Sequence, residues 1–211
     1  MLSLPADHRG LRERFAEEGY VPLPGLVPLE RLTLFRREIR RLEALAAHRD
    51  PAAARPPAAL DGLVIAAESE LIPRVYHDPA LIELVRGISA MEAVPVADPL
   101  ERHVVDILHR HGETPGTHVH PHPHPHPLAL VVFAEAPGSA RDGGLLRYGP
   151  RGAAAAVLDE AARRAHHRPG DGYLLRCDTT AHQVTGLRRP GLRRVALHFA
   201  YTTPDRQTAA R

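Results

Sequence analysis

Apolar positions recur at helical spacing near the start of the chain. Residues 11–20 predict a short helix that ends at Gly19, and residues 21–27 predict an extended segment with turns. Pro28 then favours the start of a second helix. The apolar positions that share one face of this helix are Leu32, Phe35, Ile39 and Leu42. The arginines between them are expected to form its solvated face.

A proline- and alanine-rich stretch follows this helix. Residues 49–59 do not favour regular structure, and we expect a loop or a mobile lid there. Asp78 and Pro79 predict the start of another helix, which Gly87 is expected to end.

After residue 90 the apolar positions fall into short runs separated by Gly, Pro and Asp, which is typical of strands. The predicted strands are 103–108, 128–135, 144–149, 172–177 and 194–201. The alanine-rich stretch 153–165 predicts a helix between two of them. Helices followed by many short strands indicate an α+β fold with a β-sandwich or barrel in its second half. We expect one domain over 1–211, mainly helical over 1–100 and strand-rich over 101–203.

Composition narrows the class of protein. A hydrophobic share of 44% in 211 residues is enough for a globular core, and the net charge is only +2. No Lys/Arg block is interleaved with aromatic residues, which argues against a nucleic-acid partner. No apolar run approaches membrane-spanning length and the N-terminus has no signal-peptide core. The single cysteine, Cys177, allows no intrachain disulfide and fits a cytoplasmic location.

The segment GTHVHPHPHPHPLALVV, residues 116–132, suggests metal chemistry. It carries five histidines at every second position: His118, His120, His122, His124 and His126. Neutral imidazole ligates Fe, Zn, Ni and Cu, and alternate residues of an extended strand point to the same side. A His-x-His pair therefore presents two nitrogens to one point, with His182 as the candidate third ligand. The alternative is a solvated polyproline-like arm without a site.

Several segments in series resemble one enzyme superfamily. FAEEGYVPLPGLVPLERLTLFRREI resembles the opening of phytanoyl-CoA-hydroxylase-like proteins. Most of residues 101–203 resembles a bacterial branch of the non-haem Fe(II)/2-oxoglutarate dioxygenases, through HGETPGTHVH, LALVVFAEAP, GGLLRYGP, GDGYLLRCDTTAHQVTGL and RRVALHFAY. The resemblance implies a double-stranded β-helix, a cupin-like jelly-roll barrel, with the N-terminal helices packed on it. It makes 101–203 the metal-binding core.

The resemblance also implies a set of site residues. In that family a His-x-Asp/Glu pair and a distal histidine hold the metal, and the lead-in over 112–117 places them at His118, His120 and His182. An arginine on the following strand binds 2-oxoglutarate. We expect Arg194, because it shares a strand face with Ala196 and His198, and we keep Arg193 as the reserve on the packing face.

Two departures from the family pattern matter. His120 stands where the family has a carboxylate, so the metal keeps its full +2 charge before 2-oxoglutarate binds, and dependence on that cosubstrate stays open. Halogenating relatives have a small residue there, so an imidazole disfavours halogenation. The spacing to FAEAP is also four residues longer than expected, which indicates either an insertion after His120 or a pair at His122 and His124. The lead-in over 112–117 favours the insertion, which keeps the pair at His118 and His120.

Other polar side chains receive lesser roles. Asp106 and Asp178 are candidates for orienting ligand histidines, although a turn or capping role is preferred for Asp178. Cys177 is expected to be a core thiol. His166 and His167 adjoin the predicted 153–165 helix and are given no catalytic role.

Together these features predict a mononuclear Fe(II) oxygenase, using 2-oxoglutarate and O2, that oxidises a C–H bond of a small molecule. An amino acid or a natural-product intermediate is the expected substrate, and neither a nucleic acid nor a membrane is an expected partner. One alternative is a three-His iron dioxygenase that does not use 2-oxoglutarate. The other is a non-catalytic histidine-rich protein that binds Ni, Zn or Cu.

Overall fold

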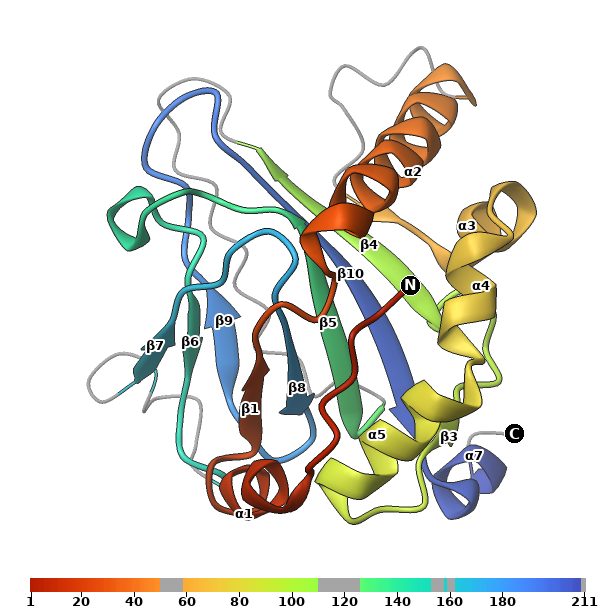
Figure 1. Cartoon of the computed structure of the whole chain (residues 1–211), viewed down its shortest axis with the longest axis vertical. Helices are drawn as coiled ribbons and strands as arrows, with labels where there is room; N and C mark the ends of the chain where they lie inside the picture. The colour runs from red at the N-terminus through yellow and green to blue at the C-terminus, as the bar shows by residue number, and fades with distance from the viewer. Residues whose placement is uncertain (50–58, 110–125, 153–157, 159–161, 210–211) are drawn as a thin grey trace.

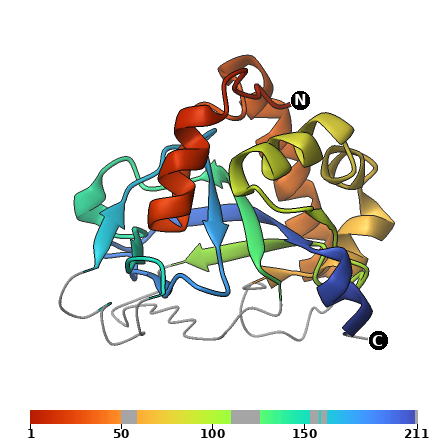
Figure 2. The ribbon, with the colours of Figure 1, turned by 90° about the horizontal axis from the view of Figure 1, so that it is seen from below.

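The helices of the N-terminal half lie on one face of a large sheet, as the computed structural model shows in two views (Figure 1 and Figure 2). The structure describes residues 1–49, 59–109, 126–152, 158 and 162–209. The helices in chain order are α1 (Arg9–Glu18), α2 (Leu29–Arg49), α3 (Gly62–Glu68), α4 (Leu71–Tyr76), α5 (Pro79–Ser89), the short 3-10 helix η1 (Ala140–Asp142) and α7 (Pro204–Ala209). The expected loop over 49–59 lies almost wholly outside this range.

Helix periodicity predicted the two principal N-terminal helices. α1 ends at Glu18 and Gly19 caps it in the left-handed conformation, with φ of 69°. Helix α2 buries one apolar face against the sheet, formed by Leu32, Phe35, Ile39 and Leu42. Both predictions are therefore confirmed.

Gly87 does not end its helix, which corrects the expectation from the sequence. α5 continues through Gly87 to Ser89, and Ala90 adopts the left-handed conformation instead, with φ of 55°. A Cβ atom at Gly87 would lie 2.4 Å from His8 Nδ1, and the Gly87 carbonyl accepts a hydrogen bond from Arg12 Nε at 2.6 Å. The glycine therefore permits close packing of the N-terminal segment on α5.

The large sheet is antiparallel and has β10 near its centre. Its order is β1-β8-β5-β10-β4-β2, and β3 pairs with the far end of β10. The strands are β1 (Tyr20–Leu23), β2 (Ala59–Leu60), β3 (Val94–Pro95), β4 (His103–His109), β5 (Leu128–Glu135), β8 (Gly172–Arg176) and β10 (Arg193–Thr202). Four of the predicted strands correspond to β4, β5, β8 and β10.

A small sheet packs on the other face of the large one. Its order is β7-β6-β9, from β6 (Leu146–Tyr148), β7 (Arg163–Ala165) and β9 (His182–Val184). The helix expected over 153–165 is therefore wrong at its end, because 163–165 pair with β6. Most of the remaining stretch lies outside the described residues.

Two apolar clusters separate the layers. One joins the helices to the outer face of the large sheet, and the second lies between the sheets. The second cluster consists of Tyr20, Val131, Phe133, Leu146, Tyr148, Tyr173, Leu175, Cys177 and Ala196. Two antiparallel sheets with helices on the outside confirm the expected α+β class.

A β-bulge interrupts β5 near its end. Val195 of β10 pairs with Glu135, whereas the next residue, Ala196, pairs with Phe133. Ala134 is therefore the extra residue on β5, and the side chain of Glu135 is turned from the inner to the helix-covered face.

No helix in the described part of the chain has both the length and the apolar character needed to cross a membrane.

Candidate metal and cosubstrate site

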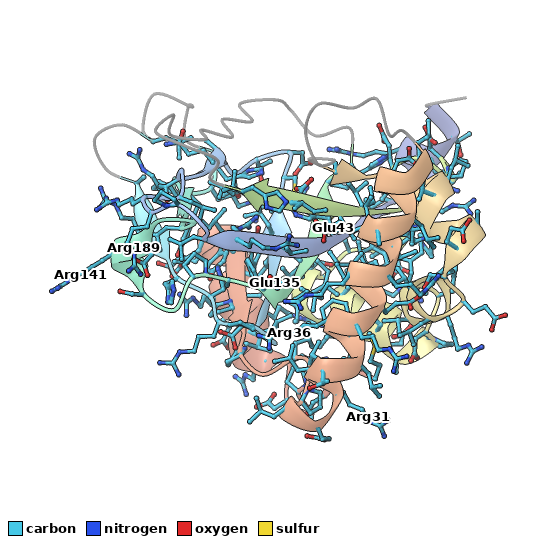
Figure 3. The ribbon with its side chains drawn as sticks, turned by 90° about the horizontal axis from the view of Figure 1, so that it is seen from above. Arg31, Arg36, Glu43, Glu135, Arg141 and Arg189 are labelled. Carbon is cyan, nitrogen blue, oxygen red and sulfur yellow. The ribbon has the colours of Figure 1, made fainter. Side chains whose placement is uncertain are left out.

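Two neighbouring arginines at the start of β10 point to opposite faces of the large sheet. Arg193 lies on the helix side, where it donates to Glu43 of α2 at 2.7 Å and to Glu135 at 3.1 Å. Figure 3 labels these two carboxylates, Glu43 and Glu135. Arg194 points to the inner face and is only 3% exposed. The alternation predicted from the sequence is therefore present in the strand.

The guanidinium of Arg194 is buried without a charge partner in the described residues. Its Nε and Nη2 have no hydrogen-bond partner there, and its carbon lies 4.9 Å from the centre of the Phe133 ring. Burial raises the pKa of the nearby Tyr173 phenol, whereas the charge of Arg194 lowers it. A buried cation with unpaired N–H groups is costly, so this position favours an anionic ligand.

His182 begins β9, whose partner β6 contributes Tyr148 directly opposite. Its Nδ1 lies 2.8 Å from the carbonyl oxygen of Thr180. A carbonyl only accepts, so Nδ1 carries a proton, and in the neutral imidazole Nε2 carries the lone pair. A backbone carbonyl that fixes the tautomer in this way is a common partner of metal-ligating histidines. The imidazole therefore fits the ligand role predicted for it.

Of the five histidines in the run, the structure describes only the last, His126. His118 and His120, like His122 and His124, lie outside the described residues, so the ligand pair and its register stay predictions. His126 precedes β5 and places Nε2 in close contact with the Glu101 carboxylate. Within the described ranges no group of three or more potential ligands from His, Cys, Asp and Glu occurs.

The two candidate orienting carboxylates occupy different environments. Asp106 on β4 lies opposite Ala196, and its Oδ2 is 2.9 Å from Nε2 of His198 on the same inner face. Asp178 instead pairs with Arg176 at 2.5 Å and Arg206 at 2.7 Å, which fits the preferred turn role. Neighbouring Cys177 is a core thiol as expected, and burial raises its pKa to about 12.

Sequence reasoning missed His167, which is 5% exposed and faces the inter-sheet cluster. Its Nε2 lies 2.9 Å from the Tyr20 hydroxyl, and its ring stacks on Phe133 at 4.7 Å with an interplanar angle of 11°. Burial lowers the pKa of His167 to about 3, and the Arg194 charge adds to this effect. The alternation of β5 points Phe133 inward, but Tyr20 is 147 positions away and no local pattern indicates this contact.

Comparisons with known proteins agree with this architecture. The sequence model of the family described as HalD, Halogenase D, matches residues 4–210. No curated protein matches the chain. Solved structures with the same fold include the non-heme alpha ketoglutarate dependent epimerase SnoN from nogalamycin biosynthesis, at 17% identity and a TM-score of 0.67 over 94% of this chain and 84% of that one.

Two further structures extend the comparison. EctD from S. alaskensis in its apoform has 15% identity and a TM-score of 0.68 over 95% of this chain and 78% of that one. HygX from Streptomyces hygroscopicus, with nickel and 2-oxoglutarate bound, has 18% identity and a TM-score of 0.61 over 95% and 88%. The expected jelly-roll fold is therefore confirmed. The family match over residues 4–210 fits the expected superfamily.

His167 should stay neutral in the folded protein well below pH 6. The unfolded chain takes up this proton near pH 6.5 and the native state only near pH 3, so this residue lowers the free energy of unfolding as the pH falls between those values. Its contribution has a slope of at most about 1.4 kcal/mol per pH unit. His167→Phe, which keeps an aromatic ring, should therefore flatten the curve of unfolding free energy against pH. Urea unfolding between pH 7 and about 4.5 measures the difference, and an imidazole that titrates near pH 6.5 in native-state NMR would contradict it.

Proposed function

This chain belongs to the Halogenase D family, and from that membership we propose that it is an Fe(II)-dependent oxygenase that uses 2-oxoglutarate and O2. It would oxidise a C–H bond of a small molecule. The substrate class that we propose is an amino acid or a natural-product intermediate. Structures of the same fold support this class, because SnoN was solved with nogalamycin RO and EctD with 5-hydroxyectoine.

The observation that carries the proposal is the uncompensated guanidinium of Arg194. It is enclosed between the sheets, and neither Nε nor Nη2 has a hydrogen-bond partner in the described part of the chain. A guanidinium presents N–H groups in a fixed fork that matches a carboxylate. We assign Arg194 to the distal carboxylate of 2-oxoglutarate. This pairing would offset the cost of keeping the charge buried.

The chain's own residues would orient the metal and the cosubstrate and exclude water from them. His182 presents Nε2 because Nδ1 donates to Thr180, and we assign it to the metal with His118 and His120. Phe133 and Tyr173 lie beside Arg194 and keep its surroundings apolar. When bound, iron with 2-oxoglutarate supplies the activation of O2 that C–H oxidation needs. Low local polarity then strengthens the arginine–carboxylate contact.

Each of His118→Ala and His182→Ala should abolish tight Fe(II) binding, because each removes one of three ligands. Anaerobic titration should show one tight Fe(II) per wild-type chain. His126→Ala is the matched control from the same run and should retain the metal, since His126 contacts Glu101. If several ions bind per chain and His182→Ala has little effect, the non-catalytic histidine-rich metal-binding protein would be favoured instead. If His122→Ala and His124→Ala lose Fe(II) binding and His118→Ala does not, the ligand pair would be His122 and His124 instead of His118 and His120.

Arg194→Ala should weaken 2-oxoglutarate binding about 30-fold or more, since truncating one partner of a buried charge pair costs about 2 kcal/mol or more. The 2-oxoglutarate affinity of Arg194→Lys should lie between those of wild type and Arg194→Ala, because lysine keeps the charge but lacks the forked N–H groups of the guanidinium. Arg193→Ala is the control on the opposite face and should bind normally. Anaerobic titration of the Fe(II) protein measures the dissociation constants. Equal affinity in Arg194→Ala and wild type would favour the dioxygenase that does not use 2-oxoglutarate.

Turnover should hydroxylate, desaturate or cyclise the substrate rather than add a halogen. The family's description points to halogenation, whereas an imidazole of His120 on the metal would take the room that a bound halide needs. Mass spectrometry of products formed in chloride-containing and chloride-free buffers distinguishes the outcomes, with succinate release as the measure of turnover. A chlorinated product would overturn this assignment and would argue against His120 as a ligand.

A further inference from the structure

The end of α1 packs against the turn that precedes His182. Gly19 adopts φ of 69°, and its N–H donates to the Phe15 carbonyl at 2.9 Å. A Cβ atom at this position would lie 2.0 Å from Oγ1 of Thr180, far closer than two such atoms approach. Thr180 is 2% exposed, so its side chain has little room to yield. The two backbones approach this closely because residue 19 has no side chain.

A series of hydrogen bonds connects this contact to His182. The Arg176 N–H donates to the Gly19 carbonyl at 2.7 Å, and the Thr180 N–H donates to the Arg176 carbonyl at 3.0 Å. The Thr180 carbonyl accepts from His182 Nδ1 at 2.8 Å. The position of Thr180 therefore determines where the imidazole lies and which of its nitrogens is protonated.

We propose that Gly19 and Thr180 are positioning residues for the metal: the end of α1 holds the Thr180 carbonyl, and this carbonyl aims Nε2 of His182. The proposal rests on the metal-ligand role assigned to His182 above. It gives the N-terminal helix control over metal affinity although none of its residues would contact the metal. Partners of ligand histidines typically change metal affinity by about 10- to 100-fold when they are disturbed.

Gly25 provides a matched control for the backbone. It also adopts a left-handed conformation, with φ of 62°, but a Cβ atom there would have no neighbour within 4 Å. Gly19→Ala and Gly25→Ala therefore introduce a similar backbone strain. Only Gly19→Ala also displaces Thr180. A difference between the two variants in metal binding reports this displacement.

The experiment compares Fe(II) dissociation constants under anaerobic conditions for wild type, Gly19→Ala, Gly25→Ala, Thr180→Ala and the double variant Gly19→Ala/Thr180→Ala. Circular dichroism first establishes that each variant is folded. Gly19→Ala should weaken Fe(II) binding by about 10-fold or more, and Gly25→Ala by less than about twofold. The double variant should recover most of the affinity, because the atom nearest to the new methyl group is then 3.3 Å away.

A spectroscopic measurement separates positioning from a general loss of stability. Nitrogen-15 NMR of the metal-free protein should show His182 protonated on Nδ1 in wild type, Gly25→Ala and the double variant. In Gly19→Ala this tautomer should be lost or mixed. If Gly19→Ala does not fold, Thr180→Val applies a smaller displacement from the other side of the contact and should weaken Fe(II) binding in the same direction.

The outcomes distinguish this inference from the function on which it rests. If Gly19→Ala and Gly25→Ala bind Fe(II) equally well, while His182→Ala still abolishes binding, the inference is overturned. Where Thr180→Val replaces Gly19→Ala, an affinity equal to that of wild type has the same meaning. Weak binding in Gly19→Ala with an unchanged tautomer and no recovery in the double variant would also overturn it. If His182→Ala binds Fe(II) normally, the ligand assignment itself fails.

Discussion

The alternation of side chains along β10 is the constraint on which the rest of the structure depends. The strand is paired on both sides, by β4 and β5, so its register is fixed over most of its length. Val195, Leu197 and Phe199 fill the helix-side core, whereas Arg194 and Ala196 face the inter-sheet space. One strand thereby supplies both the packing that holds the helices and the buried charge of the candidate site. Because successive side chains of a strand point to opposite faces, the packing residues and Arg194 lie on different sides of the sheet.

The features that follow from local periodicity were predictable from the sequence. Alternating apolar positions predicted four strands of the large sheet, and helical spacing predicted the buried face of α2. The inward direction of Arg194 followed from the same alternation. Gly87 shows the limit of this reasoning, because its role depends on His8 and Arg12, which approach it only in the folded chain. The error at 163–165 has a similar origin, since pairing with β6 overrides the local helical preference of an alanine-rich stretch.

The sequence suggested a candidate site only where the expected chemistry is carried by single residues. An imidazole and a guanidinium are recognisable in a sequence, whereas the contacts that orient them join distant segments. His182 is fixed by Thr180, Thr180 rests on Gly19, and His167 meets Tyr20 across the inter-sheet cluster. The short β1 strand and the end of α1 thus contribute to the site through packing. A glycine in EEGYV gives no sign by itself of which side chain will lie against it.

The bulge in β5 determines whether Glu135 adds its negative charge to the inner face of the large sheet. Along a regular strand Glu135 would point to the same side as Val131 and Phe133, close to where β10 places Arg194. The extra residue Ala134 turns that carboxylate outward, where it pairs with Arg193 and Arg40. Deleting Ala134 would return it inward, and the buried guanidinium of Arg194 would then face a carboxylate of its own chain.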